Sequence, residues 1–277
     1  MDFSKYMIVT DLDGTFLHKG KTVARNMEAV ARFTANGGLF TMATGRIYET
    51  IENAVPNAAA WINLPAILCN GAYLYDYATA CPRSQTFFTP ADAKRLLDFI
   101  RTQCPDAAWR VSTPTGMRAE RAAGFILRDI EAYGAENVQI APTETWRLDD
   151  WYKLVFRAEW QELAVLRERF EAQFGDSRLI AFNSGHHFLE VQYRDCHKGT
   201  GLEKLRAYTD LSARTVIACG DFENDIEMLK AADVAVCPAN AQESVKAVSD
   251  RVLCASEDGL IADVIEAIEA GTLEKRA

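Results

Sequence analysis

A short apolar run that ends in two closely spaced aspartates constrains the fold of this chain more than any other stretch. The run from Tyr6 to Val9 is partly β-branched, and Asp11, Asp13, Gly14 and Thr15 follow it. Such runs are typical of buried strands in parallel sheets, whose chemistry lies beyond the C-terminal strand ends. Residues i and i+2 of an extended chain face the same side, so the two carboxylates repel each other unless a cation or a shared proton intervenes.

Three interpretations of these aspartates are considered. The first is purely structural, a strand end followed by an Asp-Gly turn. The second is an EF-hand calcium loop, which is excluded because the required glycine would fall on Phe16 and the closing glutamate on Thr22. The third is a nucleophile paired with an acid/base around Mg²⁺. The rest of the chain decides between the first and the third.

Apolar strands alternate with helical patterns at both ends of the chain. Further buried strands are expected at 39–43, 65–69, 215–219, 234–237 and 251–253. Helices are expected from 23 to 36 with Thr22 as N-cap, from Ile47, at 198–208, up to Ala231, near 241–248 and from Leu260. This alternation predicts an α/β fold with a doubly wound, mainly parallel Rossmann-like sheet.

The middle of the chain shows a different pattern of predicted helices and strands. Helices are expected at 90–103 and about 161–173, and strand-like segments at 109–112, 124–127, 152–158, 179–183 and 187–192. None of these strands ends in a polar motif like those of the first part. We therefore expect an inserted α+β domain at 81–190 and a discontinuous Rossmann-like core formed by 1–80 and 191–277.

Charge and cysteine content exclude several classes of protein. The formal net charge is −9 without long runs of one sign, which disfavours nucleic acid and anionic membranes as partners. The seven cysteines are odd in number and include no Cys-x-x-Cys pair, so neither a zinc site nor a disulfide framework is expected. No basic-then-apolar leader and no run of 18 apolar residues is present, which predicts a cytoplasmic protein. The oligomeric state stays open.

Polar residues follow three of the predicted strands and begin one predicted helix. They are Asp11-x-Asp13, Thr44-Gly45-Arg46, Gly220-Asp221 with Asn224-Asp225, and Lys198 at the start of a helix. Parallel strand ends share one edge of a sheet, so these groups can converge. Carboxylates are hard ligands for Mg²⁺, while a hydroxyl, an unhindered backbone N–H and a lysine at a helix N-terminus suit phosphoryl oxygens. The set predicts a phosphoryl-transfer site.

This combination resembles the haloacid dehalogenase superfamily of aspartate-nucleophile phosphatases. The resemblance covers all four motifs in order: Asp11-Leu12-Asp13-Gly14-Thr15, Thr44, Lys198, and Gly220 to Asp225. The finer resemblance, to Cof-like sugar phosphatases, rests on Ala43 to Arg46, Cys69-Asn70-Gly71-Ala72, Phe188 to Val191 and Ala239-Asn240-Ala241. One departure is Asp195-Cys196-His197 before the lysine, where relatives usually carry small neutral residues. The insert after the third strand resembles the type IIB cap, an α/β lid.

The chemistry and the resemblance imply the same roles. Asp11 attacks phosphorus, and Asp13 protonates the leaving oxygen and then activates water. Mg²⁺ is expected to be held by Asp11, Asp221 and the backbone carbonyl of Asp13. Thr44 and Lys198 bind phosphoryl oxygens where charge gathers.

The remaining residues of the site have less direct roles. Gly45 and Asn224 are expected to bind the substrate phosphate, although Asn224 could instead contact metal-bound water. Arg46 reaches either the substrate or an ion-pair partner in the core. Asp225 orients the metal ligands or Lys198, or is only an acid at a helix start.

The predicted function is a Mg²⁺-dependent phosphatase that hydrolyses a small phosphorylated metabolite, in particular a sugar phosphate, through an aspartyl phosphate on Asp11. A phosphomannomutase-like phosphomutase is the alternative enzyme, because type IIB caps also occur there. A catalytically silent metabolite-binding protein is disfavoured because all four motifs keep their reactive residues. Cap side chains are expected to choose the substrate.

Overall fold

The computed structural model describes residues 1–273, and the chain divides into two compact units. One unit contains Met1–Gln85 and the chain from His197 onward, and the other is Thr86–Cys196. The predicted boundaries after residues 80 and 190 are corrected, because Cys81–Gln85 pairs with a strand of the first unit and Phe188–Tyr193 belongs to the sheet of the second. Each unit is described by itself.

The first unit is built on a five-stranded parallel sheet in the order β16-β15-β14-β1-β4. Its strands are β1 (Tyr6–Thr10), β4 (Leu39–Met42), β14 (Thr215–Cys219), β15 (Val234–Pro238) and β16 (Arg251–Leu253). An isolated parallel bridge from Ala43 to Ile67 continues the sheet toward β5 (Ala66–Leu68). β1 therefore lies between two neighbours, and its C-terminal end lies inside the sheet rather than at an outer strand.

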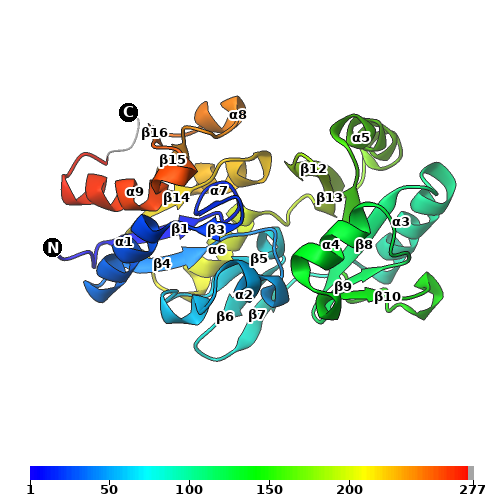
Figure 1. Cartoon of the computed structure of the whole chain (residues 1–277), viewed down its shortest axis with the longest axis horizontal. Coiled ribbons are helices and arrows are strands. Elements are labelled where there is room, and N and C mark those ends of the chain that lie inside the picture. The colour runs from blue at the N-terminus through cyan, green and yellow to red at the C-terminus, as the bar shows by residue number, and fades with distance from the viewer. Residues whose placement is uncertain (274–277) are drawn as a thin grey trace. The chain divides into compact units, whose positions relative to one another are not determined.

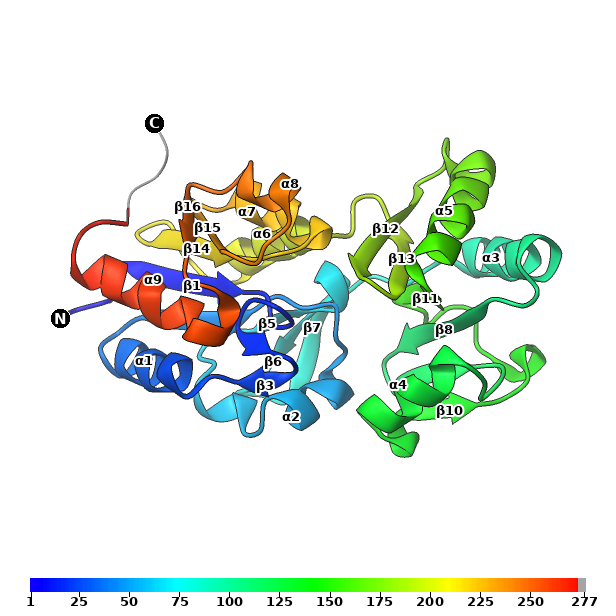
Figure 2. The same ribbon diagram turned by 45° about the horizontal axis from the view of Figure 1, so that its top comes forward.

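Helices cover both faces of this sheet, as Figures 1 and 2 show. α6 (Lys198–Tyr208) and α7 (Ile226–Ala231) pack on one face, where Met7 and Val9 of β1 meet Leu202 and Met228. α1 (Ala24–Ala35) and α9 (Leu260–Glu269) pack together on the opposite face. Because both faces are covered, β1 is buried continuously from Met7 to Thr10 instead of alternating. The predicted doubly wound α/β fold is confirmed.

Shorter elements complete the first unit. They are β2 (Leu17–His18), β3 (Lys21–Thr22), η1 (Tyr48–Thr50), α2 (Ile51–Ala54), η2 (Ala58–Ala60), η3 (Cys69–Gly71), β6 (Tyr73–Asp76), β7 (Cys81–Gln85), η6 (Glu223–Asp225), α8 (Glu243–Lys246) and η7 (Ser256–Asp258). The predicted N-cap Thr22 is wrong: Val23 occupies the cap position and makes no side-chain cap bond. The helix expected from Ile47 is only η1 followed by α2.

The second unit is a six-stranded mixed sheet in the order β10-β9-β8-β11-β13-β12. Its elements are α3 (Pro90–Gln103), β8 (Ala108–Thr113), β9 (Gly116–Ala119), α4 (Phe125–Tyr133), η4 (Ala135–Asn137), β10 (Val138–Ile140), η5 (Thr143–Thr145), β11 (Lys153–Arg157), α5 (Trp160–Phe174), β12 (Leu179–Gly185) and β13 (Phe188–Tyr193). The strand-like segment predicted at 124–127 is wrong, because α4 buries Ile126 and Asp129 at helical spacing. No helix in residues 1–273 combines the length and apolarity needed to cross a membrane.

A buried ion cluster joins α4 to the sheet of this second unit. Asp129 is 1% exposed and accepts from Arg110 Nε at 2.7 Å and pairs with Arg157 Nη2 at 2.9 Å. Both arginine side chains are nearly as buried as the aspartate. Both guanidinium groups share the Asp129 carboxylate as their partner. Its removal would leave buried positive charges without a partner, which lowers the stability of the fold.

We expect Asp129→Ala to destabilise the second unit by about 3–5 kcal/mol, because it leaves two buried guanidinium groups without their shared carboxylate. The measurement is chemical denaturation monitored by tryptophan fluorescence. The matched control is Asp149→Ala, which removes an exposed pair with Arg147 and should change the unfolding free energy by less than about 1 kcal/mol. Equal effects of the two substitutions would contradict the importance of the cluster.

Candidate active site

Three strand ends place their polar residues at one edge of the parallel sheet. The amide of Asp11 donates to Cys219 O at 2.8 Å, and the amide of Ala43 donates to Thr10 O at 2.8 Å. The ladder of β4, β1 and β14 is thus continued one residue beyond the strands. The segments that begin at Asp11, Thr44 and Gly220 leave the sheet side by side.

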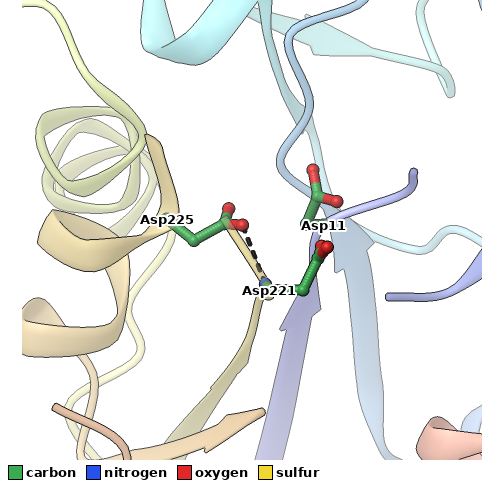
Figure 3. Close-up of side chains that lie close together, drawn as sticks. All are labelled: Asp11, Asp221 and Asp225. Atoms are coloured by element: carbon green, nitrogen blue, oxygen red, sulfur yellow. Dashed lines mark hydrogen bonds between the residues drawn. The ribbon is translucent and has the colours of Figure 1, made fainter. Parts of the chain in front are cut away.

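A buried lysine joins two of the carboxylates. Lys198 begins α6, and its Nζ lies 2.5 Å from Asp11 Oδ1 and 2.6 Å from Asp225 Oδ1. Lys198 and Asp225 are fully buried, and Asp11 is 6% exposed. The second oxygen of Asp225 accepts from the amides of Asp221 and Phe222 at 3.0 and 3.1 Å, and the first of these bonds is dashed in Figure 3. Asp225 therefore ties the lysine to the loop after β14.

Glycines let α6 approach its neighbours closely. A Cβ atom on Gly199 would lie 2.6 Å from Glu227 O, and one on Gly201 would lie 2.4 Å from a methyl carbon of Ile67. His197 caps the helix: its Nδ1 accepts from the amide of Thr200 at 3.2 Å. The imidazole before the lysine thus satisfies a backbone donor at the helix N-terminus.

Asp221 lies beside Asp11 and is held by the loop after β1. Thr15 Oγ1 donates to Asp221 Oδ1 at 2.7 Å. Gly14 has φ +94°, and a Cβ atom there would lie 2.4 Å from Asp221 Oδ2. Only glycine combines this backbone conformation with this close approach. The first aspartate loop is therefore shaped around the carboxylate that follows β14.

The carboxylates of this edge suit a divalent cation. One oxygen each of Asp11, Asp221 and Asp225 lies within 4.8 Å of the other two, and Figure 3 shows Asp11 and Asp221 close together. Both oxygens of Asp225 already accept hydrogen bonds from the protein, which leaves Asp11 and Asp221 as the stronger candidates for ligands. Hard carboxylate oxygens in a small buried group are the donor set that Mg²⁺ prefers.

The pKa values of Asp11 and Asp221 also favour a cation between these two carboxylates. Burial raises the pKa of Asp11 well above its ordinary value despite Lys198, and Asp225 and Asp221 add to the increase. Burial, with repulsion from Asp225, raises the pKa of Asp221 to about 7. Burial alone would lower the pKa of Lys198, but Asp11 and Asp225 outweigh it and raise that pKa. A cation between Asp11 and Asp221 would remove the unfavourable energy of two adjacent buried negative charges.

Asp13 points to a different partner from Asp11. Arg46 donates to both of its carboxylate oxygens, from Nε and Nη2, at 2.8 Å each. The Asp13 side chain is 51% exposed, whereas the Arg46 side chain is 16% exposed. Of the two partners expected for Arg46, the structure shows an ion pair, and that pair is made with the predicted acid/base itself.

The other predicted residues lie in the same unit. Thr44 is buried, its amide donates to Ile67 O, and its Oγ1 accepts from the amide of Arg46 at 3.2 Å. Gly45 is partly exposed between them. Asn224 lies next to Asp225 in η6 and donates from Nδ2 to Asn70 Oδ1 at 3.1 Å.

Three side chains of the site were not singled out from the sequence. Thr15 binds Asp221, Asn70 binds Asn224, and Asn240 donates to Gly14 O at 3.0 Å. All three belong to motifs on which the family resemblance rests, so those motifs could have identified them as site residues. Their partners could not be known, because each bond joins segments far apart in sequence.

Fold and site together define an α/β enzyme with a buried centre of carboxylates and a lysine. The sequence profile of the haloacid dehalogenase-like hydrolases matches residues 8–265. The chain belongs to this family of hydrolases, as its motifs predicted.

Curated relatives match the chain over most of its length. Pyridoxal phosphate phosphatase YbhA of Escherichia coli (strain K12) is 28% identical, over 89% of this chain and 92% of the relative. The 5-amino-6-(5-phospho-D-ribitylamino)uracil phosphatase YitU of Bacillus subtilis (strain 168) is 24% identical, over 95% and 97%.

Solved structures share the fold. A HAD/Cof-like hydrolase from Plasmodium vivax has a TM-score of 0.85 at 20% identity, with 96% of each chain covered. BT4131, described as a sugar phosphatase of HAD subclass IIB, has a TM-score of 0.80 at 17% identity, covering 95% of this chain and 99% of that one. The fold expected from the Cof-like, type IIB resemblance is confirmed.

The raised pKa of Asp221 gives a prediction for stability. A carboxyl whose pKa is higher in the folded state binds more protons when folded, so the unfolding free energy of the metal-free protein falls as pH rises from about 4 to about 7. One such group contributes a slope of at most about 1.4 kcal/mol per pH unit. Asp221→Asn should reduce this slope and should also reduce the stabilisation that Mg²⁺ gives at pH 7.

Denaturant titrations of the metal-free and Mg²⁺-loaded protein at several pH values check this prediction. Asp98→Asn, an exposed carboxylate on α3, is the control and should behave like the wild type. An unchanged pH slope together with an unchanged effect of Mg²⁺ in Asp221→Asn would refute the proposed origin of the repulsion.

Proposed function

We propose that this hydrolase is a Mg²⁺-dependent phosphatase that cleaves small phosphomonoesters through an aspartyl phosphate on Asp11. The observation that carries the proposal is the buried contact of Asp11 with Lys198, beside Asp221, at the end of the central strand. A carboxylate nucleophile, a cation for the phosphoryl oxygens and an oxygen-rich pair for a metal are the components that phosphoryl transfer needs.

In the proposed reaction the two aspartates of the first motif have separate roles. An oxygen of Asp11 forms a bond to phosphorus while the bond from phosphorus to the leaving oxygen breaks, and Asp13 gives that oxygen its proton. Asp13 then accepts a proton from water, whose oxygen attacks phosphorus and releases inorganic phosphate from Asp11. Arg46, paired with Asp13 through two bonds, orients its carboxylate for both transfers.

Other groups hold the phosphoryl group. Lys198 supplies a fixed positive charge next to the attacking oxygen, and Asp225 fixes the position of its Nζ. Thr44, Gly45 and Asn224 are proposed to donate hydrogen bonds to phosphoryl oxygens.

The metal site is proposed from the same carboxylates. Asp11, Asp221 and the backbone carbonyl of Asp13 would hold Mg²⁺. When bound, the ion neutralises the carboxylates and the phosphoryl charge that gather at this edge.

Relatives suggest the size and polarity of the substrate. The names of the two curated relatives specify pyridoxal phosphate and a phosphoribitylamino-uracil, both small phosphorylated metabolites. We propose a substrate of this class, with sugar phosphates first because BT4131, which shares the fold, is described as a sugar phosphatase. The unit Thr86–Cys196 is proposed to act as the cap that selects the leaving group. A cytoplasmic location without nucleic-acid or membrane partners stays a prediction.

A panel of phosphorylated metabolites, assayed for inorganic phosphate with Mg²⁺ and with chelator, tests the function. We expect release of inorganic phosphate equal to the substrate consumed, and none in excess chelator. Return of the phosphate to the sugar would indicate the phosphomutase instead. Binding of phosphorylated metabolites without turnover would indicate the silent binding protein, and full activity in chelator would refute the role of the metal.

Substitution of the two aspartates separates their roles. Asp11→Asn should abolish turnover and phosphoenzyme, because the isosteric amide cannot attack phosphorus. Asp13→Asn should still form the phosphoenzyme but lower kcat by roughly 10²- to 10⁴-fold, the usual contribution of general acid–base catalysis. Rapid quenching followed by mass spectrometry of the peptide with Asp11 measures the intermediate.

Asp210→Asn, at an exposed position of the same unit, is the matched control and should keep the wild-type rate. Turnover by pure Asp11→Asn near the wild-type rate would rule out Asp11 as the nucleophile.

A further inference from the structure

A left-handed turn follows β5 within the first unit. Cys69, Asn70 and Gly71 have φ values of +52°, +53° and +91° in succession. Cys69 and Asn70 are also almost completely buried. Residues other than glycine occupy this region at a cost, which persists only where the surroundings enforce it, and such residues cluster at functional sites. The proposed reaction has given this turn no role.

The backbone of the turn holds the loop that carries Thr44. The amide of Asn70 donates to Thr44 O at 2.9 Å, and the amide of Cys69 donates to Arg46 O at 2.9 Å. Two successive amides of the turn thus donate to the same loop. The left-handed conformation therefore has a structural reason, which is to fix Thr44 and Arg46 relative to β5.

The same turn also contacts the helix that carries Lys198. Gly71 O accepts from Lys204 Nζ at 3.2 Å, in the second turn of α6. A Cβ atom on Gly71 would lie 2.2 Å from His197 O and 3.3 Å from the amide nitrogen of Gly201. The turn is thus packed directly against the backbone of the first turn of α6.

The side chain of Asn70 contacts Asn224, which is a further residue proposed to bind phosphate. Its Oδ1 accepts from Asn224 Nδ2 at 3.1 Å, across 154 positions of sequence. An amide nitrogen carries two hydrogens, so this bond can fix the plane of the Asn224 amide while its second N–H is directed elsewhere. Asparagine suits the position because it tolerates a left-handed backbone and offers an acceptor.

We propose that Asn70 is a positioning residue, which orients Asn224 toward the substrate phosphate while its turn sets the spacing of Thr44 and Lys198. The inference rests on the proposed phosphatase function for the role of these three groups. It assigns to the Cys69-Asn70-Gly71-Ala72 motif a task in phosphate binding, carried out through other residues and without contact to the reacting atoms.

Asn70→Gly tests the side chain, because glycine keeps the left-handed backbone while the carboxamide that carries the acceptor is removed. We expect the Kd for inorganic phosphate, measured by calorimetry with Mg²⁺ present, to rise by roughly 2- to 10-fold, the usual range for one hydrogen bond. KM for a hydrolysed sugar phosphate should rise by a similar factor. Asn57→Gly makes the same change at another left-handed asparagine, which is exposed, and should leave Kd and KM unchanged.

A double-mutant cycle separates positioning from a general loss of structure. If Asn70 acts through Asn224, Asn224→Ala should raise Kd by a smaller factor in Asn70→Gly than in the wild type. Equal factors in both backgrounds, or an unchanged Kd in Asn70→Gly, would overturn the proposal. If Asn70→Gly does not fold, Asn224→Ala alone still tests the proposal from the other partner of the bond, and an unchanged phosphate Kd in that variant would overturn it.

Failure of the proposal differs from failure of the proposed function. A wild-type protein that hydrolyses no phosphomonoester refutes the phosphatase, whereas the phosphate Kd values still decide whether Asn70 positions Asn224. An active wild type with additive substitutions refutes the positioning role alone.

Discussion

The contact of Lys198 with Asp11 and Asp225 is the interaction on which the rest of the site depends. Three ionisable groups are buried at one sheet edge, and two of them are carboxylates that share one lysine. Removing such groups from water is unfavourable unless their hydrogen bonds are complete, and Asp225 completes its own with two backbone amides. Asp221 lies beside them, and its burial, together with repulsion from Asp225, raises its pKa. A divalent cation would fit there for the same reason. The arrangement holds Asp11, the proposed nucleophile, close to the positive charge of Lys198.

Much of this architecture could be predicted from local sequence. Short apolar runs such as Met7 to Val9 and Val216 to Cys219 are buried on both faces, so their composition indicated strands of a parallel sheet. The polar residues directly after them had to meet at one edge, and the structure joins Asp11, Lys198 and Asp225 there. These inferences succeeded because they depend on periodicity and on the geometry common to all parallel sheets.

Contacts between residues that are far apart in sequence could not be predicted from local patterns. The contacts of Arg46 with Asp13 and of Asn70 with Asn224 result from the packing of loops, which no local pattern encodes. The error at 124–127 has a similar origin: a run of Phe125, Ile126 and Leu127 fits a strand, and only the burial of Asp129 against two arginines shows why a helix forms. The first domain boundary lies after Gln85 and not after residue 80, because β7 pairs with β6. The composition of 81–85 does not reveal this pairing.

The glycines of α6 have a consequence for how the protein assembles. Gly199 and Gly201 stand in the first two turns, where each lowers intrinsic helix stability by about 1 kcal/mol relative to alanine. Their absent side chains are what allow the helix to approach Ile67 and Glu227 so closely. A segment of 11 residues with this composition is a poor helix in isolation, so it gains its structure from the neighbours it contacts. Formation of the lysine-bearing helix is therefore coupled to completion of the surrounding core, so that Lys198 meets Asp11 and Asp225 only once the neighbouring segments have folded.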